Sequence, residues 1–466
     1  MEKEMKETMP ATQKRADAGR KEERPDATDL PQGRRRAREG TGGDSEQQPA
    51  PQRRRVKETP QRGEEGRTRL PLPEGFYDSV FNAKWSHVLG HPGGEGEERE
   101  LRMEVKEGQS PTQWWEFDLS GMFIKPLSDA EQFRPPRPRL MVLSSEKGWP
   151  YSLQDGTALA DCFVTAEAER VWKRLNGFLR MLFRHSMGRD SEVERVLLLG
   201  TPGMGLSMTV GSYLLYQLLH YDAEQLQVAV YCLGGELAYV FDKTTQTVTE
   251  HEGAGSIVDV INGLAGREKK GYIVYDVSEE GAPPSSGLPP AGWGMILLGS
   301  PEKYNYRALA MQLRIGLTIM NCPSEPEVKA MCAWRTRDRP AQEQKEYWET
   351  VYRRMDEIGP VPRYILTEAD FNERTAAVNS ALQAIDASAA RDFFTQEEGN
   401  MWCPENPFQK LVKIGRGRSE YCLELVCASH LSEDIRSRIR GRLCMVLSYY
   451  ELLSLSARAS SFSRRR

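Results

Sequence analysis

Hydrophobic positions divide the chain into a polar beginning and a patterned remainder. Residues 1–70 contain no aromatic and few branched aliphatic side chains. Such a segment cannot bury enough apolar surface to offset the entropy of ordering, so we predict a disordered tail. From Leu70 onward, aromatic and aliphatic residues recur with the spacings of helices and strands.

The first patterned segment, 71–164, predicts a small α+β domain. Arg102–Lys106 alternates like a strand, and Arg139–Leu143 is a second short apolar run. Trp114 and Trp115 are predicted to lie in a core or interface rather than on a base-stacking platform, because no basic residues interleave with them.

Residues 165–322 are predicted to form an α/β core with a mostly parallel sheet. An amphipathic helix over 165–185 leads into apolar strands that alternate with helices. The strands end with a run at 313–320, and Ser324 with Glu327 forms a capping box for the next helix.

The remaining segments are predicted to be a helical lid over 323–390 and a C-terminal α+β segment over 391–466. The lid contains helical stretches at 341–357 and 367–387. The last segment contains short strands over 408–427 and a helix over 431–456. That helix runs into three arginines without a glycine cap, so we expect a shortened chain.

Charge separates the tail from the body. Residues 1–70 carry 18 Lys and Arg against 14 Asp and Glu, so the rest of the chain carries −8 within the net charge of −4. Two basic clusters, Gly33–Arg38 and Gln52–Lys57, are typical of nuclear-import signals or nucleic-acid contacts, and equally of a solvated tail. The N-terminus is charged and no long apolar window follows, so we expect an intracellular protein without a membrane span.

Cysteine and histidine patterns do not favour a metal site. The eight cysteines contain no Cys-x-x-Cys pair and mostly lie in apolar runs, which favours buried reduced thiols. His87 and His91 have the i, i+4 spacing of a helix that would end at Gly90, but a third ligand is missing.

The most informative stretch is Arg195–Val210, where an apolar strand runs into a glycine-rich turn and then an amphipathic helix. This is the layout of the phosphate-binding P-loop, Gly-x-x-x-x-Gly-Lys-Ser/Thr. In such a loop, backbone N–H groups converge on phosphate oxygens at the positive end of the helix. The predicted nucleotide-binding residues of the loop are Gly200, Thr201, Pro202, Gly203, Met204, Gly205, Leu206 and Ser207.

Leu206 stands where the P-loop lysine belongs, and Ser207 stands where the Mg²⁺ ligand belongs. A charge-assisted hydrogen bond contributes ~1.5–3 kcal/mol, so its loss weakens triphosphate binding by about 10- to 150-fold. We therefore predict weak binding of ATP or GTP with Mg²⁺ and little hydrolysis. Lys243, Lys269 and Lys270 are candidates to replace the missing charge, although nothing in the sequence directs them to the loop.

Three residues downstream fit the same site. Asp276 ends an apolar strand, as does an aspartate that holds Mg²⁺ in P-loop proteins. Ser300 follows the next strand and is placed to contact the terminal phosphate, and Arg363 is placed as a lid arginine. In isolation, each pattern favours the plainer interpretation, a turn serine and a surface arginine; the two gain weight only together with the loop and Asp276. Glu279 or Glu280 is either a water-orienting glutamate or loop charge.

Several strings resemble the retrotransposon hot spot proteins of trypanosomes, and the resemblance runs from about residue 75 to the end. The strings are Gly200–Gly205, Gly211–Asp222, Ala238–Val248, Gly271–Val277 and Gly359–Tyr364. The resemblance implies a large, variable multigene family of P-loop ATP- or GTP-binding proteins. These are largely nuclear and linked with chromatin, transcription and RNA export.

The same resemblance implies a lysine where this chain has Leu206, and longer members that continue into a nuclease-like domain. Two functional hypotheses follow. The first is a nuclear nucleotide-binding protein with a degenerate P-loop and Mg²⁺ ligands at Ser207 and Asp276. The second is a non-enzymatic interaction protein, or a decayed copy, that binds no nucleotide and contacts protein, RNA or chromatin complexes, with weak nucleic-acid contacts through the basic tail.

Overall fold

Apolar runs along the middle of the chain form a seven-stranded sheet in the order β11-β5-β10-β9-β6-β7-β8. Five neighbouring strands from β11 to β6 are parallel, while β7 and β8 add an antiparallel hairpin at one edge. This confirms the predicted mostly parallel sheet. The strands are β5 (Arg195–Leu199), β6 (Val228–Leu233), β7 (Leu237–Asp242), β8 (Thr247–Glu252), β9 (Gly271–Asp276), β10 (Gly294–Gly299) and β11 (Gly316–Ile319).

The computed structural model describes residues 69–91, 102–112, 114–115, 138–184, 195–277, 284–301, 315–395, 406–418 and 424–455. The two basic clusters of the tail, Glu279 and Glu280 lie outside the described residues. The predictions made for them therefore stay predictions, as do the domain boundaries.

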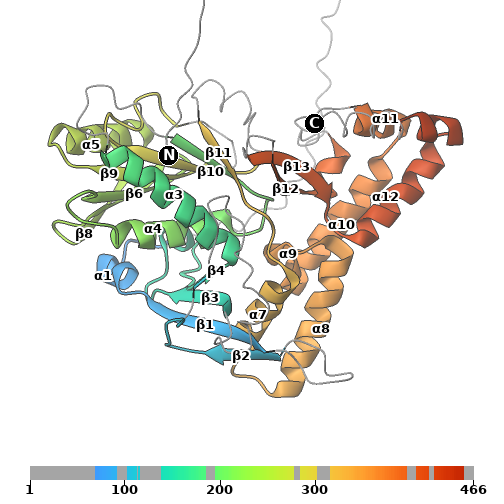
Figure 1. Ribbon diagram of the computed structural model, residues 1–466, viewed down its shortest axis with the longest axis horizontal. Helices are drawn as coiled ribbons and strands as arrows, with labels where there is room; N and C mark the ends of the chain where they lie inside the picture. Colours follow the sequence, from blue (N-terminus) through green and yellow to red (C-terminus); the bar gives the residue numbers. More distant parts are fainter. Residues whose placement is uncertain are drawn as a thin grey trace, which may run out of the picture. The chain divides into compact units, whose positions relative to one another are not determined.

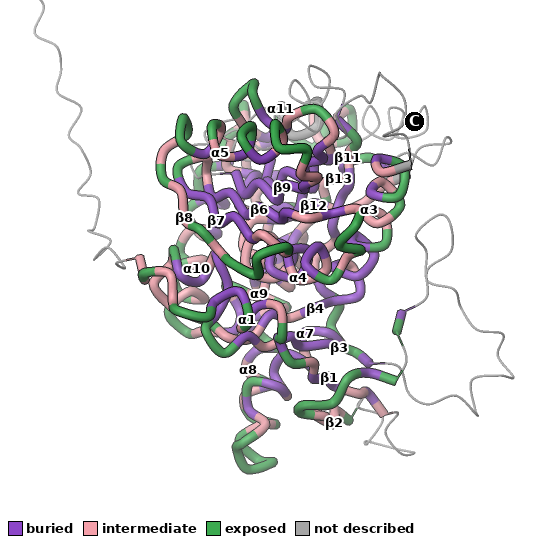
Figure 2. Tube along the Cα trace, turned by 90° about the vertical axis from the view of Figure 1, so that its left-hand side faces the viewer, coloured by how far each residue is buried: buried purple, intermediate pink, exposed green. Residues whose placement is uncertain are grey.

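Elements from different parts of the chain cover both faces of the sheet (Figure 1). Helices α3 (Ala166–Arg184) and α4 (Ser212–Leu219) pack on one face, and α5 (Ala254–Gly266) packs on the other. The hairpin of β12 (Val412–Arg418) and β13 (Glu424–His430) shares the second face through its apolar side chains. Figure 2 shows β6 and β9 buried between these layers.

An antiparallel sheet in the order β2-β1-β3-β4 precedes the large one. Along β3, Met141 and Leu143 face the core that contains α3 and α4, whereas Leu140 and Val142 face helix α7. Each side of this sheet is therefore buried. Its elements are α1 (Phe76–Phe81), β1 (Lys84–His91), β2 (Arg102–Lys106), β3 (Pro138–Ser144), α2 (Pro150–Gln154) and β4 (Asp161–Val164).

The helix expected to end at Gly90 is wrong, because His87 and His91 lie on strand β1. A spacing of four residues places two side chains on one face of a strand as well as of a helix, so it does not distinguish them. These residues form a strand because β1 pairs with both β2 and β3. Nearby, Trp115 is buried and Trp114 packs edge-on against Trp85, which agrees with the predicted core role.

Helices form the next part of the chain. The predicted capping box is present: Ser324 N donates to Glu327 Oε2 at 2.8 Å, and Glu327 Oε1 also accepts from Ala166 N at the start of α3. The final predicted helix is shorter than expected, since it ends at Val446 and a separate helical stretch covers 449–455. The helices are α7 (Glu325–Arg335), α8 (Ala341–Ile358), α9 (Pro362–Ile365), α10 (Glu368–Ala384), α11 (Ala387–Thr395) and α12 (Glu433–Val446).

A buried ionic network joins the edge of the large sheet to the β12–β13 hairpin. Glu424 accepts hydrogen bonds from Arg170 Nη1 at 2.8 Å, Arg174 Nη1 at 3.3 Å and the backbone N–H of Ile319 at 2.6 Å. Arg170 also donates to the carbonyl of Ile319. One glutamate thereby links α3, β11 and β13.

Six cysteines in the described residues are free thiols. Cys162, Cys232 and Cys332 are buried, as predicted, but Cys444 is exposed. None of the described helices is both long and apolar enough to cross a membrane.

Candidate nucleotide-binding site

The glycine-rich turn after β5 has the backbone geometry that only glycine adopts easily. Gly203 has φ 85° and Gly205 has φ 101°, both in the left-handed region. A Cβ atom on Gly203 would lie 3.0 Å from the ring of Tyr364 and 3.1 Å from Val361. The turn therefore needs glycine for its own conformation and for its contact with the segment around α9.

The helix after the turn begins as a π-helical segment, η3 (Leu206–Gly211), before α4 continues it. Two side chains donate hydrogen bonds to backbone carbonyls of this segment. Tyr231 Oη donates to Ser207 O at 2.8 Å, and Cys162 Sγ donates to Thr209 O at 3.1 Å. Burial raises the pKa of the Cys162 thiol, so it keeps the proton that it donates. The N–H groups of the first turn have no intrahelical partner and are the groups that bind phosphate in a P-loop.

Leu206 packs inward. Its methyl carbons lie 3.0 and 3.2 Å from the position of a Cβ on Gly200, and its side chain joins the cluster that contains Met204 and Val210. The position that carries a cation in an ordinary P-loop therefore contributes to the core in this chain.

Asp276 lies near the start of the P-loop helix. It is the last residue of β9, and only 6% of it is exposed. Burial and then the charge of Asp276 raise the pKa of Tyr231, whose hydroxyl contacts Ser207. The carboxylate and the start of the P-loop helix thus share one environment at the carboxyl edge of the parallel strands.

Ser300 is at the same edge. The amide of Gly200 donates to the carbonyl of Gly299 at 3.3 Å, which places the residue after β10 next to the start of the loop. Ser300 is 6% exposed. The structure therefore brings together the two strand ends that the sequence paired with the loop.

Arg363 reaches the loop from α9. Its backbone N–H donates to Gly203 O at 3.2 Å, and its side chain is exposed. Desolvation by neighbouring side chains lowers the pKa of Arg363, but interactions with Tyr151, Tyr364 and Asp155 outweigh this effect and raise the pKa above its usual value. The guanidinium thus stays a cation beside the loop.

Thr201 and Pro202 contribute differently from the glycines. Thr201 is 2% exposed, and its Oγ1 accepts from Ile414 N in β12 at 3.0 Å. Its hydroxyl thereby ties the loop to the β12–β13 hairpin. Pro202 has no N–H and contributes only to the shape of the turn.

The candidate replacement lysines lie at the amino-terminal ends of the parallel strands, whereas the loop lies at their carboxyl ends. Lys269 and Lys270 precede β9, and Lys243 follows β7 beside the start of β6. Lys243 Nζ donates to the carbonyls of Leu218 and Tyr221, and Lys269 pairs with Asp242. None of these three lysines supplies the charge missing at position 206.

Two other places were candidates for chemistry. The rings of His87 and His91 are hydrogen-bonded to Gln109 O and Glu104 Oε2, each at 2.8 Å. No group of three or more metal-ligating side chains that could hold an ion is found among the described residues.

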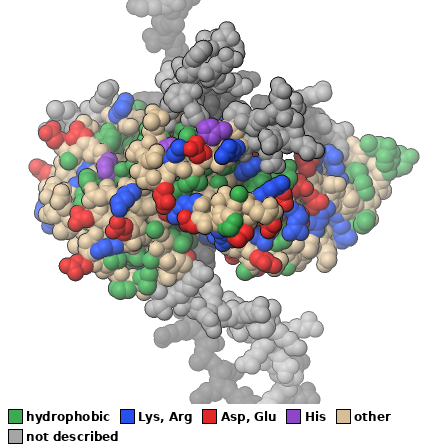
Figure 3. Space-filling view, turned by 90° about the horizontal axis from the view of Figure 1, so that it is seen from below, with side chains coloured by type: hydrophobic (Ala, Val, Ile, Leu, Met, Phe, Trp, Pro, Cys, Tyr) green, Lys and Arg blue, Asp and Glu red, His purple; other side chains and the backbone are tan. Residues whose placement is uncertain are grey.

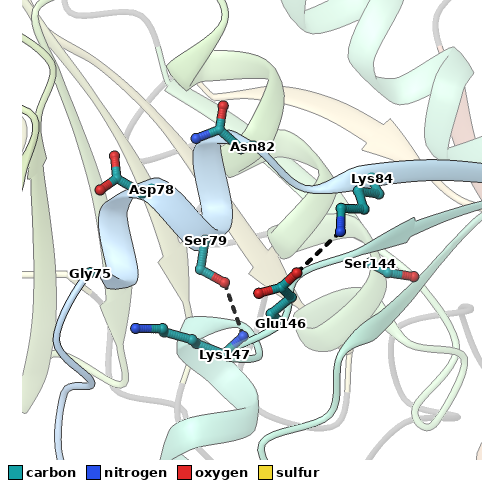
Figure 4. Close-up of a pocket in the computed structure, with 8 residues that line it drawn as sticks. All are labelled: Gly75, Asp78, Ser79, Asn82, Lys84, Ser144, Glu146 and Lys147. Carbon is teal, nitrogen blue, oxygen red and sulfur yellow. Dashed lines mark hydrogen bonds and ion pairs between the residues drawn. The ribbon is translucent and has the colours of Figure 1, made fainter. Parts of the chain in front are cut away.

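A polar cavity of about 320 Å³ lies between α1 and the β3–α2 connection (Figure 4). Lys84 Nζ pairs with Glu146 Oε1 at 3.1 Å, and Ser79 Oγ accepts from Lys147 N at 2.9 Å. Other lining groups bond residues outside the cavity: Ser144 Oγ donates to Asp161 Oδ1 and Lys147 Nζ donates to Glu74 O.

Two tyrosines in the candidate site were not found from the sequence. Tyr231 lies within a strand, where its hydroxyl has no visible target, and Tyr151 lies in a short helix of the N-terminal region. Neither residue belongs to a recognisable motif, so only the fold brings them to the loop.

Comparison with known families agrees with this architecture. The sequence profile described as "Retrotransposon hot spot protein, P-loop domain" matches residues 197–464, and the profile "Retrotransposon hot spot proteins N-terminal" matches residues 77–193. The chain belongs to the retrotransposon hot spot protein family. Its large sheet and glycine loop are the P-loop domain of that family, a nucleotide-binding fold.

No curated protein matches the chain. Among solved structures, the Aeropyrum pernix ORC2 protein in ADPNP and ADP complexes is similar at 10% identity and a TM-score of 0.24, covering 58% of this chain and 94% of that one. The Aeropyrum pernix ORC1 protein in complex with DNA is similar at 14% identity and a TM-score of 0.22, covering 60% and 91%. Scores this low carry no conclusion about what this retrotransposon hot spot protein binds.

Proposed function

We propose that this protein binds ATP or GTP with Mg²⁺ weakly, hydrolyses it little, and acts in the nucleus in chromatin, transcription or RNA complexes. The observation that carries the proposal is the convergence of Ser207, Asp276, Ser300 and Arg363 around a glycine turn at one edge of a parallel sheet. Ligand sites of parallel α/β sheets lie at this edge.

The donor groups fit the proposed ligand. Ser207 offers a hydroxyl and Asp276 a carboxylate, and Mg²⁺ prefers hard oxygen ligands of this kind with several waters. The first turn of the helix offers N–H groups to phosphate oxygens. Bound Mg²⁺ would neutralise charge on the phosphates. The residues of this chain would fix the orientation of the triphosphate.

Leu206 limits the strength of that binding. An apolar side chain packed against Gly200 cannot place a charge on the phosphates. Arg363 is our candidate for a cation at the loop, because its backbone N–H bonds to Gly203 O at 3.2 Å. The site therefore retains a positive group but lacks the lysine that steadies the transferring phosphoryl group.

Restoring the lysine tests the proposal. Leu206→Lys should tighten binding of a fluorescent ATP or GTP analogue by at least about tenfold, the low end of the charge-assisted range. Binding should require Mg²⁺ and disappear in Ser207→Ala with Asp276→Ala. Leu453→Lys adds the same charge at a side chain that is 51% exposed in the C-terminal helical stretch, and it should change nothing.

A second function is favoured by the inward packing of Leu206, which makes the loop part of the core. On this alternative the chain is an interaction protein without a nucleotide. Millimolar Mg-ATP or Mg-GTP then leaves the melting temperature unchanged, Leu206→Lys brings no gain, and partners from nuclei are still recovered with the protein.

Nuclear placement and nucleic-acid contact are assigned to the basic tail. Figure 3 shows Lys and Arg interspersed with Asp and Glu on one face of the body, so that face has no single sign of charge. Deleting residues 1–70 should abolish salt-dependent binding to RNA or DNA and move a fluorescent fusion out of the nucleus. An unchanged distribution would refute the role of the tail.

A further inference from the structure

The first turns of the P-loop helix are wound more loosely than an α-helix. The carbonyl of Gly205 accepts from Thr209 N at 2.8 Å and also from Val210 N at 3.2 Å, and the second of these bonds spans five residues. This π-helical winding covers η3 (Leu206–Gly211) before α4 resumes the normal pitch. Turns of this kind are rare and occur frequently at functional sites. The segment therefore needs contacts that hold it in this form.

Tyr231 provides such a contact from β6. Its hydroxyl donates to Ser207 O at 2.8 Å, and in an α-helix this carbonyl would accept from Gly211 N. A Cβ atom on Gly211 would overlap the same hydroxyl oxygen, so the hydroxyl also lies against Gly211. A side chain inserted in this way disturbs the regular hydrogen-bond ladder of a helix. Tyr231 thus enters the helix between Ser207 and Gly211.

The tyrosine is fixed at its other end by the sheet. It is fully buried in β6, and the pairing of β6 with β9 places Tyr231 opposite Val274 and Leu233 opposite Asp276. Its backbone is therefore two residues from the position that faces Asp276. Burial is the largest cause that raises the pKa of Tyr231 far above its usual value, so the hydroxyl keeps the proton that it donates. One side chain thus joins the start of the P-loop helix to the strand beside Asp276.

A second side chain holds the same segment from the N-terminal sheet. Cys162 Sγ, on β4, donates to Thr209 O at 3.1 Å. Its target carbonyl lies two residues beyond that of Tyr231. Tyr231 instead bonds the backbone of Ser207 itself, the residue whose hydroxyl is the proposed Mg²⁺ ligand. The orientation of Ser207 therefore depends more directly on the tyrosine than on the cysteine.

We propose that Tyr231 is a positioning residue that sets how Ser207 faces Asp276, and with it the Mg²⁺ dependence of nucleotide binding. This inference rests on the proposed function, in which Ser207 and Asp276 hold Mg²⁺. Because Mg²⁺ demands near-ideal octahedral geometry with short bonds, its protein ligands must be placed accurately. Ser207 lies on a helix and Asp276 ends a strand, and Tyr231 ties that helix to the neighbouring strand.

Tyr231→Phe removes the hydroxyl and keeps the buried ring. The loss of one neutral hydrogen bond should weaken binding of a fluorescent ATP or GTP analogue in Mg²⁺ by about 2- to 10-fold, whereas binding in EDTA should change by less than about twofold. Tyr347→Phe is the matched control, because Tyr347 Oη also donates to a backbone carbonyl, that of Leu366 at 2.9 Å, but from helix α8. It should leave both affinities unchanged. In a Ser207→Ala background, Tyr231→Phe should not alter the Mg²⁺ dependence further.

A second measurement needs no nucleotide. Hydrogen exchange with mass spectrometry reports the opening of the segment that Tyr231 holds. Peptides that contain Leu206–Gly211 should exchange about 2- to 10-fold faster in Tyr231→Phe than in wild type or Tyr347→Phe. Ser207→Ala keeps the carbonyl that Tyr231 bonds, so its exchange should match that of the wild type although its Mg²⁺ dependence is lost. Ser207 is only partly buried, so this variant tests the site even if Tyr231→Phe does not fold.

The outcomes separate the two claims. Absence of nucleotide binding in wild type and in Leu206→Lys overturns the proposed function and the role of Tyr231 with it. Mg²⁺ dependence that survives in Ser207→Ala, or that Tyr231→Phe leaves unchanged, overturns the role of Tyr231 alone. An equal loss of affinity with and without Mg²⁺ also overturns it, because the tyrosine would then support the whole loop. Unchanged hydrogen exchange in Tyr231→Phe would show that the hydroxyl does not hold the segment.

Discussion

Replacing Glu424 with glutamine removes the one negative charge that joins α3, β11 and β13. In the wild type, the side chains of Glu424 and Arg170 are 6% and 3% exposed, and their ion pair measures 2.8 Å. The same carboxylate accepts the Ile319 N–H at 2.6 Å. The variant keeps the shape of the side chain but leaves Arg170 buried without this counter-charge.

The expected cost follows from that burial. Breaking a buried ion pair by removing one partner costs about 3–5 kcal/mol, because the remaining charge stays desolvated. Glutamine retains one acceptor oxygen and Arg170 keeps its ion pair with Glu167 at 3.1 Å, so we take the low end of that range, about 3 kcal/mol. This corresponds to somewhat more than a 100-fold change in an equilibrium constant. Because Glu424 accepts the Ile319 N–H of the edge strand, the free energy of opening β11 should fall by this amount.

Hydrogen exchange with mass spectrometry measures this locally. Peptides that contain Gly316–Ile319 should exchange about 100-fold faster in Glu424→Gln, while α10 is little affected. Glu146→Gln is the control, since its pair with Lys84 is exposed at 78% and 72%, and exposed pairs contribute little. If the two variants exchange alike in β11, the network does not hold the edge strand.

Two further predictions concern the loop and a buried lysine. Gly203→Ala should lower the free energy of unfolding by about 1–3 kcal/mol in a denaturant titration, because φ of Gly203 is 85° and the added Cβ would lie 3.0 Å from Tyr364. Gly177→Ala is the control and should not destabilise the protein, because a Cβ on Gly177 would have no atom within 4 Å. Equal midpoints for the two variants would contradict this reasoning. Burial lowers the pKa of Lys243 to about 8. Between pH 8 and about 10 the unfolded chain therefore binds more protons than the folded chain. The free energy of unfolding should rise over that range by about 1–3 kcal/mol relative to Lys243→Met. Identical pH slopes for wild type and Lys243→Met would show that burial does not perturb this lysine.

The sequence was sufficient for the P-loop architecture because its signals are local. A run of leucines before Gly200 forms a buried strand, the glycines allow the turn, and the polar residues Asp276 and Ser300 follow apolar strands directly. Parallel strands bring such positions to one edge, so strand ends can be paired without knowing the packing.

What the sequence did not show depends on distant partners. Tyr231 Oη donates to Ser207 O, and nothing in the sequence around either residue indicates the other. Glu424 resembles a surface residue in sequence and is buried only because two arginines of α3 meet it. The two histidines of β1 fit a helix and a strand equally until the neighbouring strands are known.

The hydrogen bonds from Ile414 to Thr201 and from Arg363 to Gly203 have a consequence for truncated forms of this chain. Both partners of the loop are encoded far downstream of it. A stop codon between codons 340 and 360 would leave every letter of the glycine motif intact, yet remove both of these tethers. In a truncated form of this chain, an unchanged motif is therefore no guarantee of a formed loop, and an intact chain through residue 414 is as informative as the motif itself.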